Sequence, residues 1–151
     1  MLYYLGIGSN LGNREQTIRE ALRLLDEQVG RQLGVAPFIY SAPQGFSSNN
    51  EFCNTVALYE SAMQPLEVLA CTQAIEQQLG RTEHSTLLPD GTKQYADREI
   101  DIDLIEAYDN EGTEIRVNTP ILTLPHPRMS ERTFVLEPLR QLKHKTSTHK
   151  T

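Results

Sequence analysis

The apolar positions along the chain change between two periods, and this change predicts where strands give way to helices. Residues 2–8 form an almost continuous apolar run, typical of a buried strand. After the turn-forming residues 8–12, we expect a helix from its cap at Asn13 to about Gly30, because apolar residues recur there at helical spacing. Those apolar residues are Ile18, Ala21, Leu22, Leu25 and Val29.

The next elements follow the same logic. Residues 34–41 and 52–59 alternate as strands, and the loop at 42–50 between them is rich in turn formers. A second helix is expected from Pro65, a residue favoured in first turns, to Gly80, a residue favoured at helix ends.

A strand predicted at 97–105 carries the most informative polar pair. Asp101 and Asp103 face one side of it, and the apolar residues around them face the other. Two carboxylates this close repel each other unless solvent, a proton or a divalent cation such as Mg²⁺ separates their charges. Arg98 adds a positive group suited to phosphate. Because a bare D-x-D strand is more often a solvated sheet edge, the metal interpretation depends on the other motifs.

The predicted elements in the rest of the chain are shorter. A polar hairpin is expected around 109–112 with a return strand at 114–117, and a short helix capped by Ser130 should end near Leu139. The β-α-β-β-α-β order predicts an α+β fold of the ferredoxin-like kind, an antiparallel sheet with helices on one face, followed by the C-terminal hairpin and short helix.

The length of 151 residues fits one domain, expected at 1–142, with a polar, disordered tail at 143–151. The net charge of -6 argues against broad nucleic-acid binding, and no apolar run reaches membrane-spanning length. The two cysteines have no metal-ligand spacing and no signal peptide precedes the first strand, so we expect a cytoplasmic protein. The glycines at 6–12 follow G-x-G-x-x-x-G, which is neither a dinucleotide fingerprint nor a P-loop.

Several motifs in one order resemble a known family, that of 6-hydroxymethyl-7,8-dihydropterin pyrophosphokinase, from about residue 3 to residue 139. They are Gly8-Ser9-Asn10-Leu11-Gly12, Phe52-x-Asn54, Gln73-x-x-Glu76-x-x-x-Gly80-Arg81, Arg98-x-x-Asp101-Ile102-Asp103-Leu104-Ile105 and Leu124-Pro125-His126-Pro127-x-Met129-x-x-Arg132-x-Phe134.

The resemblance implies an enzyme of folate synthesis that moves the β,γ-pyrophosphoryl unit of ATP onto the hydroxymethyl oxygen of the reduced pterin and leaves AMP. Asp101 and Asp103 match the pair that holds two Mg²⁺ ions, and with Arg81 and Arg98 they are the candidate catalytic residues. Most of the rate would come from positioning and charge stabilisation, and no residue stands out as a general base.

The resemblance also implies a pterin site and an ATP site. Phe52 and Phe134 match the aromatic residues that sandwich the pterin, Asn54 matches the amide that reads its edge, and the backbone of Ala42-Pro43-Gln44 adds edge contacts. The residues that match the polar surroundings of ATP are Gln73, Glu76, Arg81, Arg98, His126 and Arg132, and those that fall near adenine are Leu104, Leu122 and Thr123. His126 would donate to phosphate.

The segment 82–96 is a candidate lid that orders when nucleotide binds, since it has few residues to bury. It departs from the family, because Glu83 and Tyr95 stand where many members have Arg and Trp, and Asp97 stands where the family often has Pro. Lys93 is the candidate replacement for the lost phosphate contact.

Two other functions stay open on the residues alone. One is a two-metal nucleotidyl transferase acting on nucleic acid, which the acidic balance and the missing basic stripe disfavour. The other is a small-molecule-binding regulatory module, which would need no paired carboxylates, so Mg²⁺-dependent ATP binding discriminates. With the preferred interpretation we expect a monomer that binds ATP and the reduced pterin and neither nucleic acid nor membrane.

Overall fold

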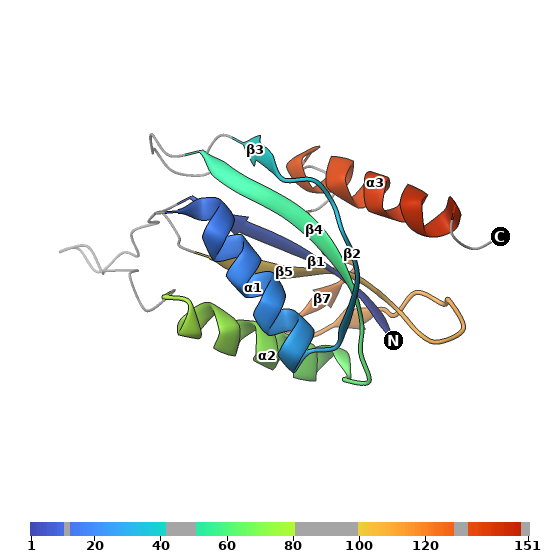
Figure 1. Ribbon diagram of the computed structural model, residues 1–151. Coiled ribbons are helices and arrows are strands. Elements are labelled where there is room, and N and C mark those ends of the chain that lie inside the picture. Colours follow the sequence, from blue (N-terminus) through green and yellow to red (C-terminus); the bar gives the residue numbers. More distant parts are fainter. Residues whose placement is uncertain (11–12, 42–50, 81–99, 129–132, 149–151) are drawn as a thin grey trace.

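The computed structural model describes residues 1–10, 13–41, 51–80, 100–128 and 133–148 of the chain. These residues form a mixed α/β structure with three helices and antiparallel sheets. Figure 1 shows the main sheet running through the middle of the molecule, with helices along it.

The main sheet has five strands in the order β2-β4-β1-β5, with β3 paired to β4 as well. All its described pairings are antiparallel. The strands are β1 (Leu2–Ser9), β2 (Arg31–Val35), β3 (Ile39–Ser41), β4 (Phe52–Glu60) and β5 (Asp101–Tyr108). The predictions for β1 and β4 are confirmed to within one residue, and the described part of the aspartate strand is also a strand.

The strand expected at 34–41 is instead two short strands, β2 and β3, and β2 begins earlier at Arg31. The interruption lies at 36–38, where Pro37 has no amide hydrogen to give to a ladder. The pairing with β4 is also shifted between Gln32 and Gly34, which marks an irregularity just before the break.

Helices α1 (Arg14–Gln28) and α2 (Pro65–Gln78) lie together along one side of the sheet (Figure 1). The Asn13 side chain accepts a hydrogen bond from the backbone N–H of Gln16 at 3.2 Å, which confirms the predicted cap of α1. Both helices pack on the larger apolar core together with the inward residues of β1, β4 and β5. That core includes Ile18, Leu25, Val68, Ile75, Tyr3, Leu5, Tyr59, Ile100 and Ile102.

Helix α3 (Thr133–Thr148) packs in a second apolar cluster on the opposite face. Its residues Val135, Leu139 and Leu142 meet Tyr4, Val56, Leu58 and Ile105 of the sheet. The sequence predicted a short helix ending near Leu139. The helix is longer because Leu142 continues its apolar stripe by one turn, so that 143–148, expected to belong to a disordered tail, is helical.

A polar and aromatic cluster fixes this extra turn to the sheet. The Lys143 Nζ lies 2.6 Å from Glu106 Oε1, and the hydroxyl of Tyr108 donates to the same oxygen at 2.9 Å. The ammonium also lies 5.6 Å from the ring centre of Tyr4 and 5.9 Å from that of Tyr108. Burial alone would lower the pKa of Lys143, but the Glu106 carboxylate outweighs burial and holds this pKa above its usual value.

The chain after β5 turns back through the predicted hairpin. Asp109 Oδ1 accepts from the backbone N–H groups of Glu111 and Thr113, each at 2.9 Å, and Gly112 has a φ of 84°, which favours glycine. Of the expected return strand, Glu114 forms an isolated bridge to Tyr108. A two-stranded sheet of β6 (Val117–Asn118) and β7 (Thr123–Leu124) follows.

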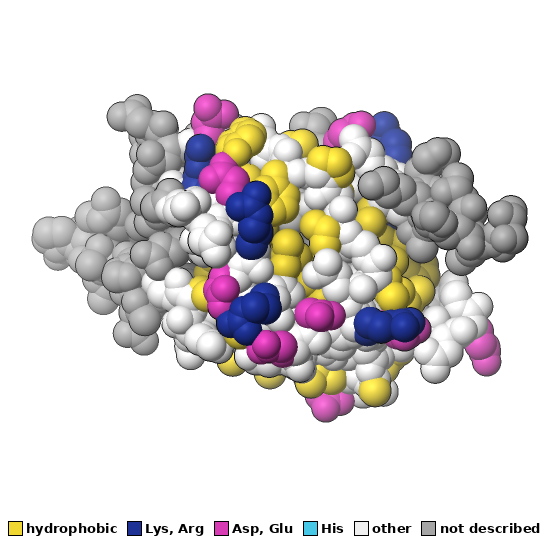
Figure 2. Space-filling model, in the orientation of Figure 1, with side chains coloured by type: hydrophobic (Ala, Val, Ile, Leu, Met, Phe, Trp, Pro, Cys, Tyr) yellow, Lys and Arg dark blue, Asp and Glu magenta, His cyan; other side chains and the backbone are white. Residues whose placement is uncertain are grey.

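In the part of the chain that the structure describes, no helix combines the length and the apolar character needed to cross a membrane. Figure 2 shows that on the face formed by α1 and α2 the acidic and basic side chains are interspersed, and neither sign gathers into a stripe among the coloured residues.

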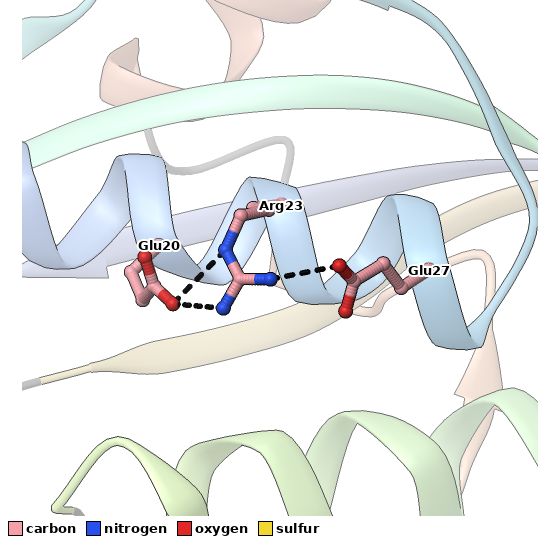
Figure 3. Close-up of polar contacts among 3 residues, drawn as sticks. All are labelled: Glu20, Arg23 and Glu27. Atoms are coloured by element: carbon pink, nitrogen blue, oxygen red, sulfur yellow. Dashed lines mark hydrogen bonds and ion pairs between the residues drawn. The ribbon is translucent and has the colours of Figure 1, made fainter.

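We predict that Lys143→Met lowers the free energy of unfolding by about 1 kcal/mol, since it removes a half-buried ion pair and the cation above two rings. Arg23→Met is the matched control, because Arg23 pairs with Glu20 and Glu27 on the exposed surface of α1 (Figure 3). Urea unfolding measures both variants. Equal losses in the two would show that the cluster does not hold α3 to the sheet.

Candidate active site

The candidate site spans three neighbouring strands, β4, β1 and β5, and its layout follows from their register. On β1, Gly8 lies opposite Asn54 of β4 on one side and opposite Asp101 of β5 on the other. Gly6 likewise lies between Val56 and Asp103. Directly opposed residues of an antiparallel sheet project from the same face, so Asn54 and both aspartates share one face.

That face is the one on which α3 packs, because Val56 belongs to the cluster formed with α3. The residues that alternate with the two aspartates face the other side of the sheet, since Ile100 and Ile102 are buried in the core beneath α1 and α2. The prediction that Asp101 and Asp103 share a face while the apolar residues take the other is therefore confirmed. Both aspartates are partly exposed.

Gly6 and Gly8 form a strip without side chains of its own between the amide and the carboxylates, and the side chains of Asn54 and Ile105 cover it. A Cβ at Gly8 would lie 2.9 Å from Asn54 Oδ1 and 3.7 Å from Phe52 Cδ1. Phe52 and Asn54 therefore stand together beside this glycine, with the aspartate strand on its other side. The strand spacing of about 4.8 Å puts the backbones of Asn54 and Asp101 about 10 Å apart. This strip separates two chemically different halves of the site.

The Asn54 side chain belongs to the first half and is held in place. It is only 6% exposed, and its Nδ2 donates to the backbone oxygen of Phe52 at 3.3 Å. Because a side-chain amide can both donate and accept, it suits a heterocycle edge that presents both kinds of group. Phe52 is partly buried and supplies an aromatic surface next to it.

The aspartate strand is fixed from α2 by a buried carboxylate. Glu76 is 5% exposed, and its Oε2 accepts a hydrogen bond of 2.8 Å from the backbone N–H of Ile102, the residue between the two aspartates. Within the described sheet β5 is an edge strand, whose outward amide needs such a partner. Glu76 thus ties α2 to the backbone that carries Asp101 and Asp103.

The backbone of His126 is bound to β5 at an irregularity of that strand. The pairing of β5 with β1 shifts between Leu104 and Glu106, which leaves Ile105 as the extra residue of a bulge. The Ile105 carbonyl accepts from the backbone N–H of His126 at 2.8 Å. The His126 Nδ1 accepts from the backbone N–H of Arg128 at 3.2 Å, which places the proton of the neutral ring on Nε2.

The donor chemistry of the aspartate pair fits Mg²⁺. Among the described residues, no group of three or more His, Cys, Asp or Glu side chains could hold a metal ion. A pair of carboxylates is still a suitable anchor, because Mg²⁺ in phosphate-handling proteins usually takes one or two carboxylates and completes its shell with phosphate oxygens and water.

The other predicted site residues are placed as follows. Gln73 lies on the exposed side of α2, Leu104 and Leu122 are buried in the larger core, and Thr123 begins β7. Phe134 is the second residue of α3, and its side chain is not among those described. The residues outside the described ranges are Ala42, Pro43, Gln44, Arg81, Arg98 and Arg132, together with the predicted lid at 82–96 and its residues Glu83, Lys93 and Tyr95, and Asp97.

Sequence reasoning missed two features of the site. Gly6 and Gly8 lie inside the predicted first strand, as β1 confirms, but their place side by side on the face of the site was not predicted. Their spacing of two residues was an available signal, since it places two absent side chains on one face. Arg14, the first residue of α1, was not singled out, yet its NH1 donates to the backbone oxygen of Glu51 at 2.7 Å, next to Phe52. No local signal could have found that contact.

Comparison with known proteins gives a consistent result. The family described as 7,8-dihydro-6-hydroxymethylpterin-pyrophosphokinase matches residues 4–144. A 2-amino-4-hydroxy-6-hydroxymethyldihydropteridine pyrophosphokinase from Porphyromonas gingivalis is 41% identical over 138 residues, covering 91% of this chain and 88% of that protein. The protein of the same name from Bacillus subtilis is 34% identical over 92% of this chain and 76% of its own length.

A longer plant protein is also similar to the chain. The mitochondrial folate synthesis bifunctional protein of Pisum sativum is 33% identical over 91% of this chain, which corresponds to 24% of the plant protein. The present chain is therefore similar to one part of that larger protein.

We predict that Gly8→Ala displaces the Asn54 side chain, because a Cβ at position 8 would lie 2.9 Å from Asn54 Oδ1. The overpacking should cost about 1 to 3 kcal/mol and shift the side-chain amide signals of Asn54 in NMR spectra. Gly6→Ala is the control. Its Cβ would lie 3.1 Å from Ile105 Cδ1, so it adds the same methyl group to β1 without meeting Asn54. Unchanged Asn54 signals in Gly8→Ala would contradict the tight packing between the two residues.

Proposed function

The chain belongs to the 7,8-dihydro-6-hydroxymethylpterin-pyrophosphokinase family, and we propose that it transfers pyrophosphate from ATP to 6-hydroxymethyl-7,8-dihydropterin in a Mg²⁺-dependent reaction of folate biosynthesis. As a member it is a pyrophosphokinase, a kinase-type diphosphotransferase. The observation that carries the finer proposal is the placement of Asn54 and Asp101 on either side of Gly8. This arrangement offers separate places for a heterocycle and for phosphates on one face.

The first half of the site is proposed to bind the pterin. Phe52 supplies the stacking surface, and the Asn54 amide pairs with the donor and acceptor edge of the ring. Phe134, at the start of α3, is proposed to cover the other side of the ring, with edge contacts from the backbone of Ala42-Pro43-Gln44. Gly8 leaves room for the Asn54 side chain, whose Oδ1 lies 2.9 Å from the position that a Cβ would take there.

The second half is proposed to bind the triphosphate. Asp101 and Asp103 would hold two Mg²⁺ ions, which supply charge neutralisation of the phosphates. His126 donates from Nε2 to a phosphate oxygen, and Arg81, Arg98 and Arg132 add positive charge. Gln73 and Glu76 are proposed to contact ATP, with Leu104, Leu122 and Thr123 nearer to adenine. Glu76 is also proposed to position the two aspartates through its hydrogen bond to the backbone of Ile102.

In the proposed reaction, the hydroxymethyl oxygen of the pterin attacks the β-phosphorus of ATP. A bond from this oxygen to the β-phosphorus forms, the bond from the β-phosphorus to the oxygen shared with the α-phosphorus breaks, and AMP leaves as the hydroxyl proton is released. The residues of the chain act mainly by fixing the two substrates in line, and such positioning provides a large part of the rate in phosphoryl transfer.

The two alternative functions fit the findings less well. A nucleotidyl transferase on nucleic acid would need a basic surface, whereas the face in Figure 2 mixes both signs. A regulatory binding module would not need the aspartate pair on the face of Asn54. The sheet order β2-β4-β1-β5 also supports the ferredoxin-like description within the proposal. Cys53 and Cys71 are free thiols, which supports a cytoplasmic location, and we propose a monomer that binds no nucleic acid or membrane.

We predict that the purified chain converts ATP and 6-hydroxymethyl-7,8-dihydropterin into AMP and the pterin diphosphate, and only when Mg²⁺ is present. Mass spectrometry of the products measures this directly. Formation of ADP in place of AMP would contradict pyrophosphoryl transfer, and turnover in excess EDTA would contradict the metal requirement.

We also predict that Asp101→Asn and Asp103→Asn each lower turnover by at least about 100-fold, the scale of removing one preorganised electrostatic group. Both side chains are partly exposed, so the variants should fold, which circular dichroism checks. Glu20→Gln on the exposed surface of α1 controls for the loss of a negative charge. Near-normal turnover of both aspartate variants at limiting Mg²⁺ would remove the metal-pair assignment.

A further inference from the structure

The residues that we assign to the pterin lie at one end of the hairpin formed by β3 and β4. These two strands pair over a short length. Strand β3 pairs with β4 only from Ile39 opposite Asn54 to Ser41 opposite Phe52. The chain between the two strands lies outside the described residues. What holds the start of β4 against this short partner therefore matters for the pterin half of the site.

The first turn of α1 contacts both strands of this hairpin. The Arg14 NH1 donates to the backbone oxygen of Glu51 at 2.7 Å, and the Arg14 guanidinium lies 5.0 Å from the ring centre of Tyr40. The neighbouring Glu15 accepts a hydrogen bond from the Tyr40 hydroxyl. One side of the hairpin is thus held through a backbone carbonyl and the other through an aromatic ring.

A chain of bonds leads from Arg14 to the candidate pterin contacts. The Glu51 carbonyl and the Phe52 amide belong to one planar peptide unit. The hydrogen bond from Arg14 to that carbonyl therefore also fixes the orientation of the Phe52 amide. The backbone oxygen of Phe52 in turn accepts from Asn54 Nδ2 at 3.3 Å. A rotation of the peptide unit at Glu51 would therefore move both the Phe52 ring and the Asn54 side-chain amide.

We propose that Arg14 is a positioning residue that sets the affinity for the pterin by holding the first residues of β4. The proposal rests on the proposed function for the identity of the ligand. Arg14 acts through Phe52 and Asn54, and touches neither substrate nor metal in this role.

Arginine suits this position better than lysine. The planar guanidinium can lie over the Tyr40 ring and donate in its own plane to the Glu51 carbonyl at the same time, whereas an ammonium offers no flat surface. The companion bond is stable at neutral pH, because the hydrogen bond to Tyr40 lowers the pKa of Glu15 and the same bond raises the pKa of Tyr40 to about 12. The carboxylate stays an acceptor and the hydroxyl stays a donor.

The test compares Arg14→Met with Arg19→Met in steady-state kinetics. Arg19 lies on the same helix and also stands over an aromatic ring, that of Phe38 at 5.5 Å. Among the described residues it makes no hydrogen bond to the start of β4, so it serves as the matched control. In Arg14→Met we expect the KM for the pterin to rise about tenfold, the scale of losing one charge-assisted hydrogen bond, with the KM for ATP and kcat within about twofold. Arg14→Lys should recover only part of the loss.

The result distinguishes positioning from a general loss of structure. A purely structural role for Arg14 would lower the melting temperature and the active fraction but leave the pterin KM of the folded enzyme at the Arg19→Met value, and that outcome would overturn the proposal. Tyr40→Phe keeps the ring and removes the bond to Glu15, so it should raise the pterin KM less than Arg14→Met does.

A measurement without substrates separates this proposal from the assigned activity. In NMR spectra of the free protein, Arg14→Met should shift the Phe52 amide and the Asn54 side-chain signals, and Arg19→Met should leave them in place. Absence of those shifts refutes the role of Arg14 whatever the enzyme makes. If wild-type enzyme forms no AMP and pterin diphosphate, the proposed function fails, while the shifts would still establish that Arg14 positions β4.

Discussion

The register of β1 between its two neighbours is the constraint on which the site depends. Because β1 pairs with β4 and with β5, each residue of β1 fixes which side chains of the two outer strands stand at the same level. Gly8 puts Asn54 level with Asp101, and a slip of one residue on either side would turn one of them to the opposite face. Backbone hydrogen bonds, which are the same for every type of residue, thereby bring an amide and a carboxylate to one surface.

The same strand, β1, is well anchored although it contributes two glycines to the face of the site. On the face with Gly6 and Gly8 the side chains of Asn54 and Ile105 cover the two glycines, whereas the alternate residues Leu5 and Ile7 are buried in the core beneath α1 and α2. Burial of large aliphatic side chains contributes on the order of 1.5 to 3 kcal/mol each, so β1 is held firmly from below. A strand fixed in this way tolerates two glycines, which would otherwise weaken it.

Much of this arrangement could be predicted from the sequence where the signal is local. Alternation placed Asp101 and Asp103 opposite the buried isoleucines, and Asn13 marked the start of α1. The failures have physical causes that are not local. Pro37 divides a run that looked like one strand, and α3 extends past Leu139 because Leu142 and Lys143 find partners on β1, β4 and β5 that are distant in sequence. The bond from Arg14 to Glu51 is equally remote, so no spacing rule could reveal it.

The two halves of the site are held by different helices of the same layer. The first turn of α1 reaches the start of β4 through Arg14, and the last turn of α2 reaches the start of β5 through Glu76. Each contact ends on a backbone group, so it fixes the strand without using the side chains that face the candidate site. Since β1 lies between the two strands and is buried on its helix side, a small movement of one outer strand need not be passed to the other. The fold can therefore hold the proposed heterocycle side and the proposed phosphate side separately, although both share a single sheet.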